Sequence, residues 1–305
     1  SEDGGTATFT FKVNTVPDDL DSSTNNDNVT ISISSSDTTE GTVYPSQLVF
    51  KKSNWNSENL ITVTGVDDNL SDGNQSYSII LNVDNSTSAV GYSILNPSDV
   101  NLYNIDNDGT AGFLISSASG SVSESGSTAT FTVKLTSQPS SQVDIPVSVS
   151  DTTEASVSTD NGTTLTFTTE NWNADHVVTV TGLNDNLSDG TQSYVIRLDA
   201  DNSTTDTVGY KSLDPQDVAM STTDDEAASF MVSSASGSVS ESGSTATFTV
   251  KLTSQPSSQV DIPVSVSDTT EASVSTDNGT TLTFTTENWN ADHVVTVTGL
   301  QRQPV

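Results

Sequence analysis

The sequence predicts an all-β protein built from tandem immunoglobulin-like antiparallel β-sandwiches of about seven strands each, which follow one another like beads on a string. The first observation behind this prediction is a repeat, because residues 116–183 recur letter for letter as residues 233–300. A fixed period of this kind indicates a tandem array of one folding unit. The second is the pattern inside the unit, where short runs of alternating apolar residues and Ser or Thr are separated by polar turns. No helical periodicity appears, and such runs are typical of a sandwich.

The period divides the chain into three repeats. A looser copy of residues 123–131 opens the chain at residues 1–9. We therefore expect repeat 1 at residues 1–110 without its first strand, and a complete repeat 2 at residues 111–227. Repeat 3, at residues 228–305, is expected to lack its last two strands. A unit of roughly 110 residues is long enough for one sandwich core.

The first strands of the complete repeat are predicted from alternation. Two short apolar runs at residues 113–115 and 120–122 predict a first strand in two pieces, because a Ser-rich stretch separates them. Residues 129–135 alternate apolar and polar side chains without a break, which predicts the second strand. A polar loop leads to a third strand at residues 143–149, and a polar turn then precedes a short segment at residues 155–157.

The later strands are bounded by turns rich in Gly, Asn and Asp, which are residues that favour turns. They show the same alternation and are predicted at residues 164–167, 176–181, 193–198 and 217–221.

The apolar side of this alternation predicts the core. The expected core residues of repeat 2 are Phe131, Val133, Leu135, Leu165, Phe167, Val178, Val180, Tyr194, Ile196 and Leu198. Trp172 lies in an Asn-Trp-Asn sequence that recurs around Trp55 and Trp289. We expect this Trp to cap the core; the alternative is an exposed platform on which a sugar stacks.

The composition excludes several classes of function. Eight Lys and Arg against 40 Asp and Glu give a formal charge of −32. With so few cations to displace counterions, we expect no binding to nucleic acid, and an anionic membrane surface is disfavoured too. No apolar run is long enough to span a bilayer, so we expect no membrane insertion. The absence of Cys excludes disulfides and thiolate chemistry.

The acidic residues of repeat 2 are predicted to meet at one end of the sandwich. Alternate loops of an up-and-down sandwich share an end, and four acidic loops alternate in this way if each predicted segment is one strand. If residues 155–157 cross the sandwich as a separate strand, this parity changes. The residues concerned are Glu124, Asp151, Glu154, Asp185, Asp189, Asp224, Asp225 and Glu226.

A shared end of this kind favours a cation. Two carboxylates about 4 Å apart repel by about 4 kcal/mol at an effective dielectric constant near 20. A hard divalent cation offsets this repulsion, and Ca²⁺ takes six to eight oxygen ligands from flexible loops. Zinc and copper are poorly supported, because the two His residues, His176 and His293, occupy equivalent strand starts. The alternative is that the acidic residues only keep a Ser- and Thr-rich surface soluble.

The repeat resembles a Calx-beta domain, the calcium-binding sandwich found in sodium–calcium exchangers, in integrin beta-4 and in many bacterial surface proteins. The matching features are Val122-Ser-Glu124 with Thr128-Ala-Thr-Phe-Thr-Val133, the Ser150-Asp151 turn, Leu165-Thr-Phe167, Val178-Thr-Val180, Asn184-Asp185-Asn186 with Asp189, Gln192 and Tyr194, and the closing Asp224-Asp-Glu226.

The resemblance implies calcium ligands in the two repeats that carry these motifs. In repeat 2 they are Glu124, Asp151, Asp185, Asp189, Asp224, Asp225 and Glu226; in repeat 1 they are Glu2, Asp37, Asp67, Asp68, Asp72, Asp106 and Asp108. Asn184, Gln192 and Gln75 stand where family members that bind several ions often carry acids, which predicts fewer or weaker sites.

Repeat 3 departs from the motif. It retains Glu241, Asp268 and Glu271 but diverges at residues 301–305, where the acidic loop should begin. We expect its end of the sandwich to bind calcium poorly on its own.

The sequence therefore predicts a calcium-binding structural region of a large extracellular or cell-surface protein, of the adhesin or matrix kind. Its partners would be calcium ions and neighbouring repeats, with calcium rigidifying the junctions between domains. Two alternatives remain: a filament or sheath subunit that pairs with other copies through open sandwich edges, and a carbohydrate-binding module that contacts a surface glycan. We expect no enzyme, because there is no nucleophile elbow and no phosphate-binding glycine loop.

Overall fold

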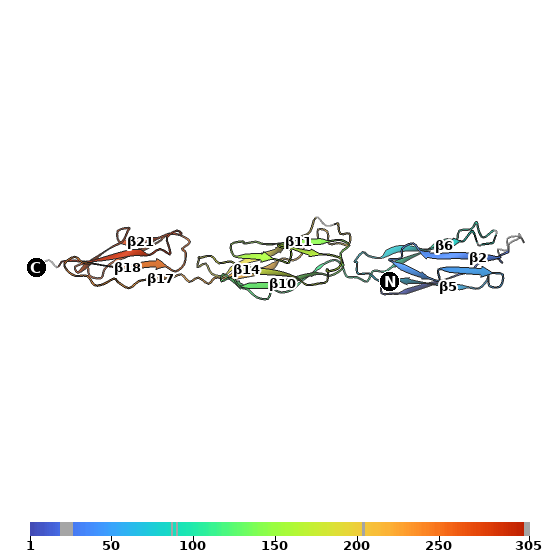
Figure 1. Ribbon diagram of the computed structural model, residues 1–305, viewed down its shortest axis with the longest axis horizontal. Helices are drawn as coiled ribbons and strands as arrows, with labels where there is room; N and C mark the ends of the chain where they lie inside the picture. The colour runs from blue at the N-terminus through green and yellow to red at the C-terminus, as the bar shows by residue number, and fades with distance from the viewer. Residues whose placement is uncertain (19–26, 87, 90, 203–204, 302–305) are drawn as a thin grey trace.

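The computed structural model describes residues 1–18, 27–86, 88, 89, 91–202 and 205–301. In these ranges the chain forms strands β1 to β22 and no helix, which confirms the predicted all-β class. Figure 1 shows three units in a row along the long axis, formed by β1–β7, β8–β16 and β17–β22. Residues 302–305 of the predicted divergent tail lie outside the described part. Within the described part of the chain, no helix is long and apolar enough to cross a membrane.

Repeat 2 is a two-sheet sandwich whose first strand is divided between the sheets. One sheet has the order β12-β14-β10-β8 and the other β13-β11-β15-β16-β9. The pairs are antiparallel, except that β9 runs parallel to β16. The strands are β8 (Phe113–Ile115), β9 (Val122–Ser123), β10 (Thr128–Leu135), β11 (Val143–Val149), β12 (Ala155–Ser158), β13 (Thr164–Phe167), β14 (His176–Gly182), β15 (Gln192–Leu198) and β16 (Val218–Thr223).

Repeat 1 has the same two sheets, and its described residues include no counterparts of β8 and β9. Its sheets have the orders β1-β5-β3 and β4-β2-β6-β7. The strands are β1 (Thr6–Phe11), β2 (Asn28–Ser35), β3 (Gly41–Tyr44), β4 (Gln47–Lys51), β5 (Asn59–Gly65), β6 (Gln75–Val83) and β7 (Val100–Asn104).

Repeat 3 has one four-stranded sheet, β17-β18-β22-β20, and one of only two strands, β19-β21. Its described residues include no counterparts of β15 and β16. The strands are β17 (Phe230–Val232), β18 (Thr245–Leu252), β19 (Val260–Pro263), β20 (Ala272–Ser275), β21 (Thr281–Phe284) and β22 (His293–Gly299).

The segment at residues 155–158 decides which loops share an end. It is a separate strand, β12, and it pairs with β14 on the sheet opposite β13. Because β10 and β12 are both antiparallel to β14, they run in the same direction. The chain turns aside at residues 159–163 and continues into β13, which is antiparallel to β11. β12 and β13 thus run in the same direction and act as one strand that changes sheets. The number of times the chain crosses the sandwich is therefore as predicted, and the acidic loops lie at the same end of the sandwich.

The alternating apolar residues fill the core as predicted. All ten expected core residues of repeat 2 belong to one buried cluster. Trp172 is half-buried against that cluster, and Trp55 and Trp289 pack in the same way in the other repeats. This packing favours the core-capping interpretation. The Thr and Ser residues between them point outward, so each sheet has one apolar and one polar face.

Candidate metal centres

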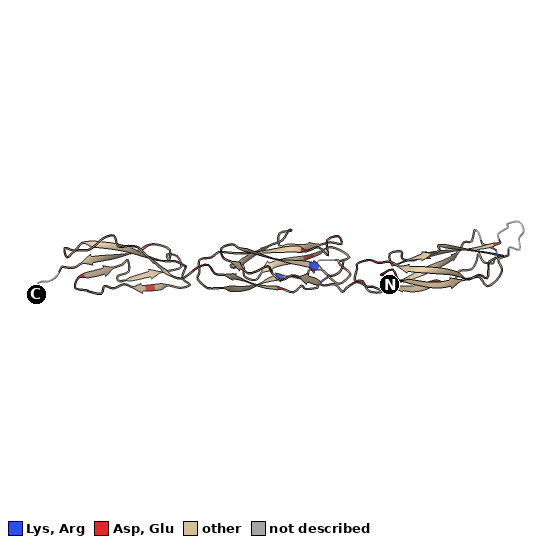
Figure 2. Cartoon of the chain, turned by 90° about the horizontal axis from the view of Figure 1, so that it is seen from below, with Lys and Arg blue, Asp and Glu red and all other residues tan. Residues whose placement is uncertain are grey.

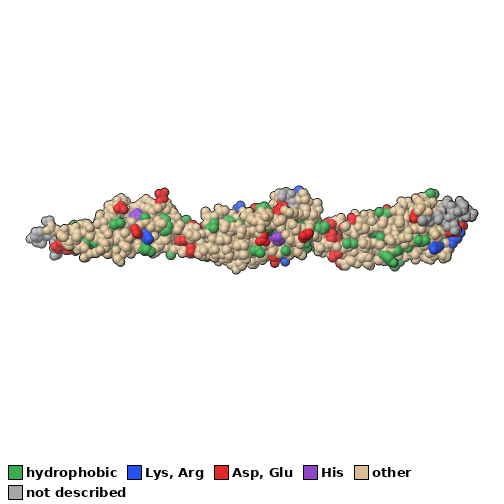
Figure 3. Space-filling view, in the orientation of Figure 1, with side chains coloured by type: hydrophobic (Ala, Val, Ile, Leu, Met, Phe, Trp, Pro, Cys, Tyr) green, Lys and Arg blue, Asp and Glu red, His purple; other side chains and the backbone are tan. Residues whose placement is uncertain are grey.

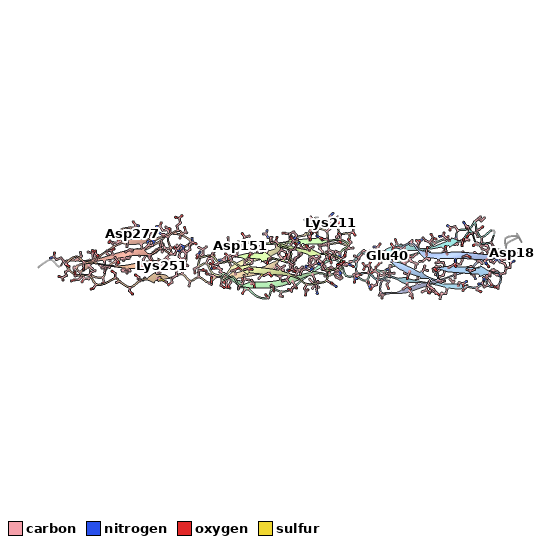
Figure 4. All side chains as sticks on the ribbon, viewed as in Figure 1. Asp18, Glu40, Asp151, Lys211, Lys251 and Asp277 are labelled. Atoms are coloured by element: carbon pink, nitrogen blue, oxygen red, sulfur yellow. The ribbon has the colours of Figure 1, made fainter. Side chains whose placement is uncertain are left out.

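Each of the first two repeats carries a set of closely spaced acidic residues at the end that faces the next repeat. We call this end the acidic pole. Figure 4 labels Glu40 at the end of repeat 1 beside repeat 2, and Asp151 at the end of repeat 2 beside repeat 3. Figures 2 and 3 show acidic residues at both junctions, where basic residues are sparse. The negative charge of the chain is therefore concentrated where two repeats meet.

Two groups of three carboxylates lie at each acidic pole. Within each group, one oxygen from every residue lies within 4.8 Å of the others. We name the groups by the segment that supplies two of the three acids. The linker groups are Glu2, Asp106 and Asp108 in repeat 1 and Glu124, Asp224 and Glu226 in repeat 2; the turn groups are Glu40, Asp68 and Asp72 and, in repeat 2, Glu154, Asp185 and Asp189.

The linker group of repeat 2 is assembled by the parallel pairing of β9 with β16. This pairing continues into Glu124, whose N–H donates to the Thr223 carbonyl oxygen at 3.1 Å. The chain beside Glu124 passes directly over Gly182, where an added Cβ would overlap the Ser123 carbonyl oxygen. After β16, the Glu226 N–H donates to Asp224 Oδ1 at 2.7 Å and holds the closing acidic run in a tight turn.

Glu124 is the most unusual side chain of this group. It is only 1 % exposed, and neither of its carboxylate oxygens has a hydrogen-bond partner. Burial raises the pKa of Glu124 to about 8, and the neighbouring Glu226 and Asp185 add to the rise. Oε2 of Glu226 is buried without a partner as well. Unpartnered buried carboxylate oxygens are costly, so something other than protein is expected to satisfy them.

Repeat 1 builds its linker group in the same way. Glu2 is 1 % exposed and accepts a 3.3 Å hydrogen bond from the Asn107 N–H. Burial raises the pKa of Glu2 to about 7, and the Asp106 charge adds to this rise. Burial also raises the pKa of Asp108, whose Oδ2 has no partner. The linker groups of the two repeats thus share a buried glutamate and an unpartnered oxygen on the last acid, Asp108 or Glu226, but the glutamate itself lacks a partner only in repeat 2.

The turn groups lie beside the linker groups. In repeat 2, Glu154 enters β12 with an exposed fraction of 6 %, and burial raises its pKa. Asp185 and Asp189 come from the turn between β14 and β15. In repeat 1, burial raises the pKa of Glu40, which accepts a 3.3 Å hydrogen bond from Asn104 Nδ2.

The donor set fits a hard divalent cation. All four groups consist of carboxylates alone, which Ca²⁺ prefers to nitrogen or sulfur ligands. None of the ion pairs formed within the described residues involves a carboxylate of these groups. His176 and His293 belong to none of these groups. They lie at strand starts, where their ring centroids are 4.5 Å from those of Phe167 and Phe284.

Not every acid that the resemblance implies joins a group. Asp37 and Asp151 are exposed and stabilise their own turns instead; Asp151 Oδ1 accepts hydrogen bonds from the Thr153 N–H at 3.0 Å and the Thr153 hydroxyl at 2.6 Å. These bonds lower the pKa of Asp151. Asp67 and Asp225 are exposed and lie outside the groups as well. The other ten predicted residues are brought together.

The turn groups include two glutamates that the resemblance did not imply. Glu40 and Glu154 occupy equivalent positions at the start of β3 and β12. Glu154 was recognised only as part of the acidic turn after β11. No local pattern separates Glu154 from Asp151, because alternation along a strand would point the neighbour of the buried Ala155 away from the core.

Repeat 3 assembles no such group among its described residues. Glu241 and Glu271, which correspond to Glu124 and Glu154, are both exposed. Asp268 occupies the position in repeat 3 that Asp151 occupies in repeat 2. Its Oδ1 accepts hydrogen bonds from the Thr270 N–H at 2.9 Å and from the Thr270 hydroxyl at 2.6 Å, as Asp151 does from Thr153.

Comparison with known proteins identifies a family for all three repeats. The sequence profile of the Calx-beta domain matches residues 6–109, 105–227 and 223–299. Among solved structures, the calcium binding domain CBD12 of CALX1.1 shares 14 % identity with a TM-score of 0.25, over 65 % of this chain and 74 % of that chain. Domains 4–9 of the surface layer protein SbsC share 14 % identity with a TM-score of 0.30, over 97 % of this chain and 38 % of that one. No curated protein sequence matches the chain.

Proposed function

Because the Calx-beta profile covers the three repeats in succession, the chain belongs to the Calx-beta domain family, and we propose that it is a calcium-binding structural region of an extracellular or cell-surface protein. In this proposal calcium binds at the acidic poles and rigidifies the junctions between repeats. The residues that would hold the ions are those of the linker and turn groups.

The observation that carries the proposal is the buried carboxylate of Glu124. An ionised carboxylate without partners is strongly disfavoured in a buried site, and here two further carboxylates lie within 4.8 Å of it. A bound calcium ion supplies positive charge that stabilises the ionised form of all three side chains. Simple solubility does not explain this arrangement, because a solubilising acid is exposed to water.

The mechanical role follows from where the groups lie. The linker group includes acids that immediately precede the next repeat, and two of the three acids of the turn group lie on a loop that contacts that repeat. Repulsion among the carboxylates pushes these segments apart, whereas neutralisation lets them hold one arrangement. Extracellular calcium modules often bind with dissociation constants of about 10⁻⁴–10⁻³ M, which favours a location outside the cell, where calcium is abundant.

The test is to compare the full chain with calcium and with a chelator. We expect calcium to raise the melting temperature and to narrow the distribution of shapes in small-angle X-ray scattering. Calorimetry should count up to four ions, one for each group. If EDTA changed neither the melting temperature nor the scattering, the proposal would be wrong.

Adhesion, matrix attachment, filament assembly through sandwich edges and glycan binding are finer statements that stay predictions. Light scattering at increasing protein concentration tests assembly. Trp fluorescence during glycan titration tests sugar binding, because each repeat carries one Trp, at Trp55, Trp172 and Trp289.

A further inference from the structure

The turn that carries two acids of each turn group also contacts the next repeat. At the first junction, the Gln138 N–H donates to the Asn69 carbonyl oxygen at 2.9 Å, and Leu70 forms an isolated parallel bridge with Gln138. At the second junction, the Gln255 N–H donates to the Asn186 carbonyl oxygen at 2.6 Å, and Leu187 bridges Gln255. The same contact therefore occurs twice, between different pairs of repeats.

The side chain at the centre of this contact is a leucine in an otherwise polar turn. Leu70 belongs to repeat 1 but packs against the core cluster of repeat 2. Leu187 lines a pocket of about 500 Å³ at the second junction, together with Phe230, Leu252 and Pro256 of repeat 3. We call Leu70 and Leu187 the anchor leucines. Each removes apolar surface from water only while the next repeat is in place.

Each anchor leucine is held by a carboxylate of the turn group. The Leu70 N–H donates to Asp68 Oδ1 at 2.7 Å, and the Leu187 N–H donates to Asp185 Oδ1 at 2.6 Å. Asp68 and Asp185 are themselves members of the turn groups. A single short turn thus fixes both the position of the anchor and the convergence of the carboxylates.

The segment that follows the linker group contacts the same loop of the next repeat, which in repeat 2 contains Thr136 and Gln138, through different hydrogen bonds. The Thr136 hydroxyl donates to the Thr110 carbonyl oxygen at 2.8 Å, and the Thr136 N–H donates to that of Gly112 at 3.0 Å. Thr253 repeats this contact with Ala227 and Ser229 at the second junction. This connection follows the covalent linker and does not involve the anchor leucine.

We propose that the anchor leucines couple ion binding at the turn group to docking of the next repeat, so that each strengthens the other. The same turn also donates to the linker group, from the Gly73 N–H to Asp106 Oδ2 at 2.7 Å and from the Gly190 N–H to Asp224 Oδ2 at 2.8 Å, so the anchor affects the linker group indirectly and less strongly. The proposal rests on the calcium function proposed above. Coupling between two sites is reciprocal, so a repeat that docks well also raises the ion affinity of the preceding turn group. The turn group then sets the angle of the junction, and the linker group maintains its connection.

The two junctions should differ in the strength of this coupling. Pro139, next to Gln138, is buried in repeat 2, whereas the corresponding Pro256 in repeat 3 is only half-buried. Tyr210 closes this end of repeat 2 by donating its hydroxyl to the Ser137 carbonyl oxygen at 2.9 Å. The described part of repeat 3 has no counterpart of Tyr210, so the pocket that Leu187 lines at the second junction is covered by fewer side chains.

The experiment uses the full chain with both anchors replaced, Leu70→Ser with Leu187→Ser. The matched control is Leu114→Ser, because Leu114 is 55 % exposed on the outer side of β8 and belongs to no junction contact described here. In calcium titrations by calorimetry, we expect the double variant to weaken two of four sites about tenfold, within the usual range for coupled sites. The calcium affinities of the two linker groups should fall by less than those of the turn groups, and all four affinities of the Leu114→Ser control should match those of the unsubstituted chain. Leu70→Met with Leu187→Met should restore the affinity.

A second readout follows the junction itself. The chain has no Cys, so spin labels can be placed at the exposed positions Ser57 and Asn173 as Ser57→Cys and Asn173→Cys. Double electron–electron resonance then measures the distance across the first junction. We expect saturating calcium to narrow the distance distribution of the labelled chain, and Leu70→Ser to keep it broad at the same calcium concentration.

The outcomes separate the two proposals. If the unsubstituted chain binds no calcium, the proposed function fails. If it binds calcium but the double serine variant retains all affinities and the narrow distance distribution, the coupling fails and the calcium function stands. Equal weakening of all four sites would also overturn the coupling, because the anchor leucine is bonded directly to a turn-group carboxylate and reaches the linker group only through later residues of the turn.

Discussion

Repeats 2 and 3 share residues 116–183 and 233–300 letter for letter, yet among their described residues grouped carboxylates are found in repeat 2 and not in repeat 3. The two copies pair β10 with β14 and β18 with β22 in matching registers. However, β9 has no counterpart in the described part of repeat 3, and β19 is shorter than β11. The glutamate that ends the first strand differs, since Glu124 is 1 % exposed and Glu241 is exposed. The carbonyl oxygen that fixes Glu124 belongs to Thr223 of β16. The comparison teaches that the pairing of β10 with β14 follows from the shared sequence alone, whereas β9, the end of β11 and the ion site require the last two strands.

The largest difference between the two copies is expected on removing this glutamate. Glu124→Gln should weaken calcium binding at its linker group by about a hundredfold or more, because even residues outside the coordination shell are worth about 10–100-fold. Glu241→Gln should leave every calcium affinity unchanged. Calorimetric titration of the two variants is the measurement. A comparable loss in Glu241→Gln would mean that repeat 3 also holds an ion at its glutamate.

A second contrast is expected in the pH dependence of the metal-free chain. Glu124 has a folded-state pKa of about 8 against an ordinary value of 4.5, so the folded state holds its proton more tightly than the unfolded chain. Its contribution to stability is complete below about pH 4.5 and is lost as the pH rises to 8. With Trp55→Phe and Trp289→Phe, Trp172 reports repeat 2 alone. We expect its melting temperature in EDTA to fall by roughly 5 °C or more between pH 5 and pH 8.

Two controls sharpen this prediction. Glu124→Gln should flatten the profile of repeat 2, because the titrating group is removed. Saturating calcium should reverse the trend, because the ion competes with the proton and binds better at high pH. A steep fall that persisted in Glu124→Gln would assign the pH dependence to other groups.

A third contrast tests the close passage of the chain over the last glycine of the strand. An added Cβ would overlap a carbonyl oxygen both at Gly182 and at Gly299, which lie at equivalent positions. Ala substitution should therefore destabilise either repeat by about 1–3 kcal/mol, measured by urea unfolding with one Trp per repeat. Only Gly182→Ala should also weaken calcium binding, since only there does the crossing segment carry a grouped glutamate. An unchanged calcium affinity in Gly182→Ala would show that the site tolerates a shift of β9.

The fold and core were predictable because their signals are periodic. The alternation of residues such as Val178 and Val180 is visible in any short window, and the exact repeat confirms the unit. The convergence of the acidic loops also followed from strand parity. It held although residues 155–158 form a separate strand, because that strand runs in the same direction as β13.

The membership of the groups was less predictable. Asp224 and Glu226 are two residues apart and point the same way after β16, whereas Asp225 points outward; period-2 alternation could have excluded it. No such pattern predicts that Glu154, and not Asp151, joins the turn group. Asp151 is captured by its own turn through Thr153, and Glu154 is buried by contacts that depend on the assembled sandwich. The two junction contacts of Leu70 and Leu187 depend on a neighbouring repeat, which no local pattern encodes.

The smallest contrast concerns the core beneath identical sequence. Val180 is fully buried in repeat 2, whereas its counterpart Val297 is only half-buried, because the described part of repeat 3 lacks strands that would cover it. Removing two methyl groups costs about 0.8 kcal/mol each in transfer free energy, plus a cavity term where the site cannot collapse. Val180→Ala should therefore lower the free energy of unfolding of repeat 2 by about 2 kcal/mol, and Val297→Ala that of repeat 3 by about 1 kcal/mol or less. Urea unfolding followed by Trp172 or Trp289 measures both. Equal losses would mean that the core of repeat 3 is closed in solution, and the contrast between the two copies would then be confined to their acidic poles.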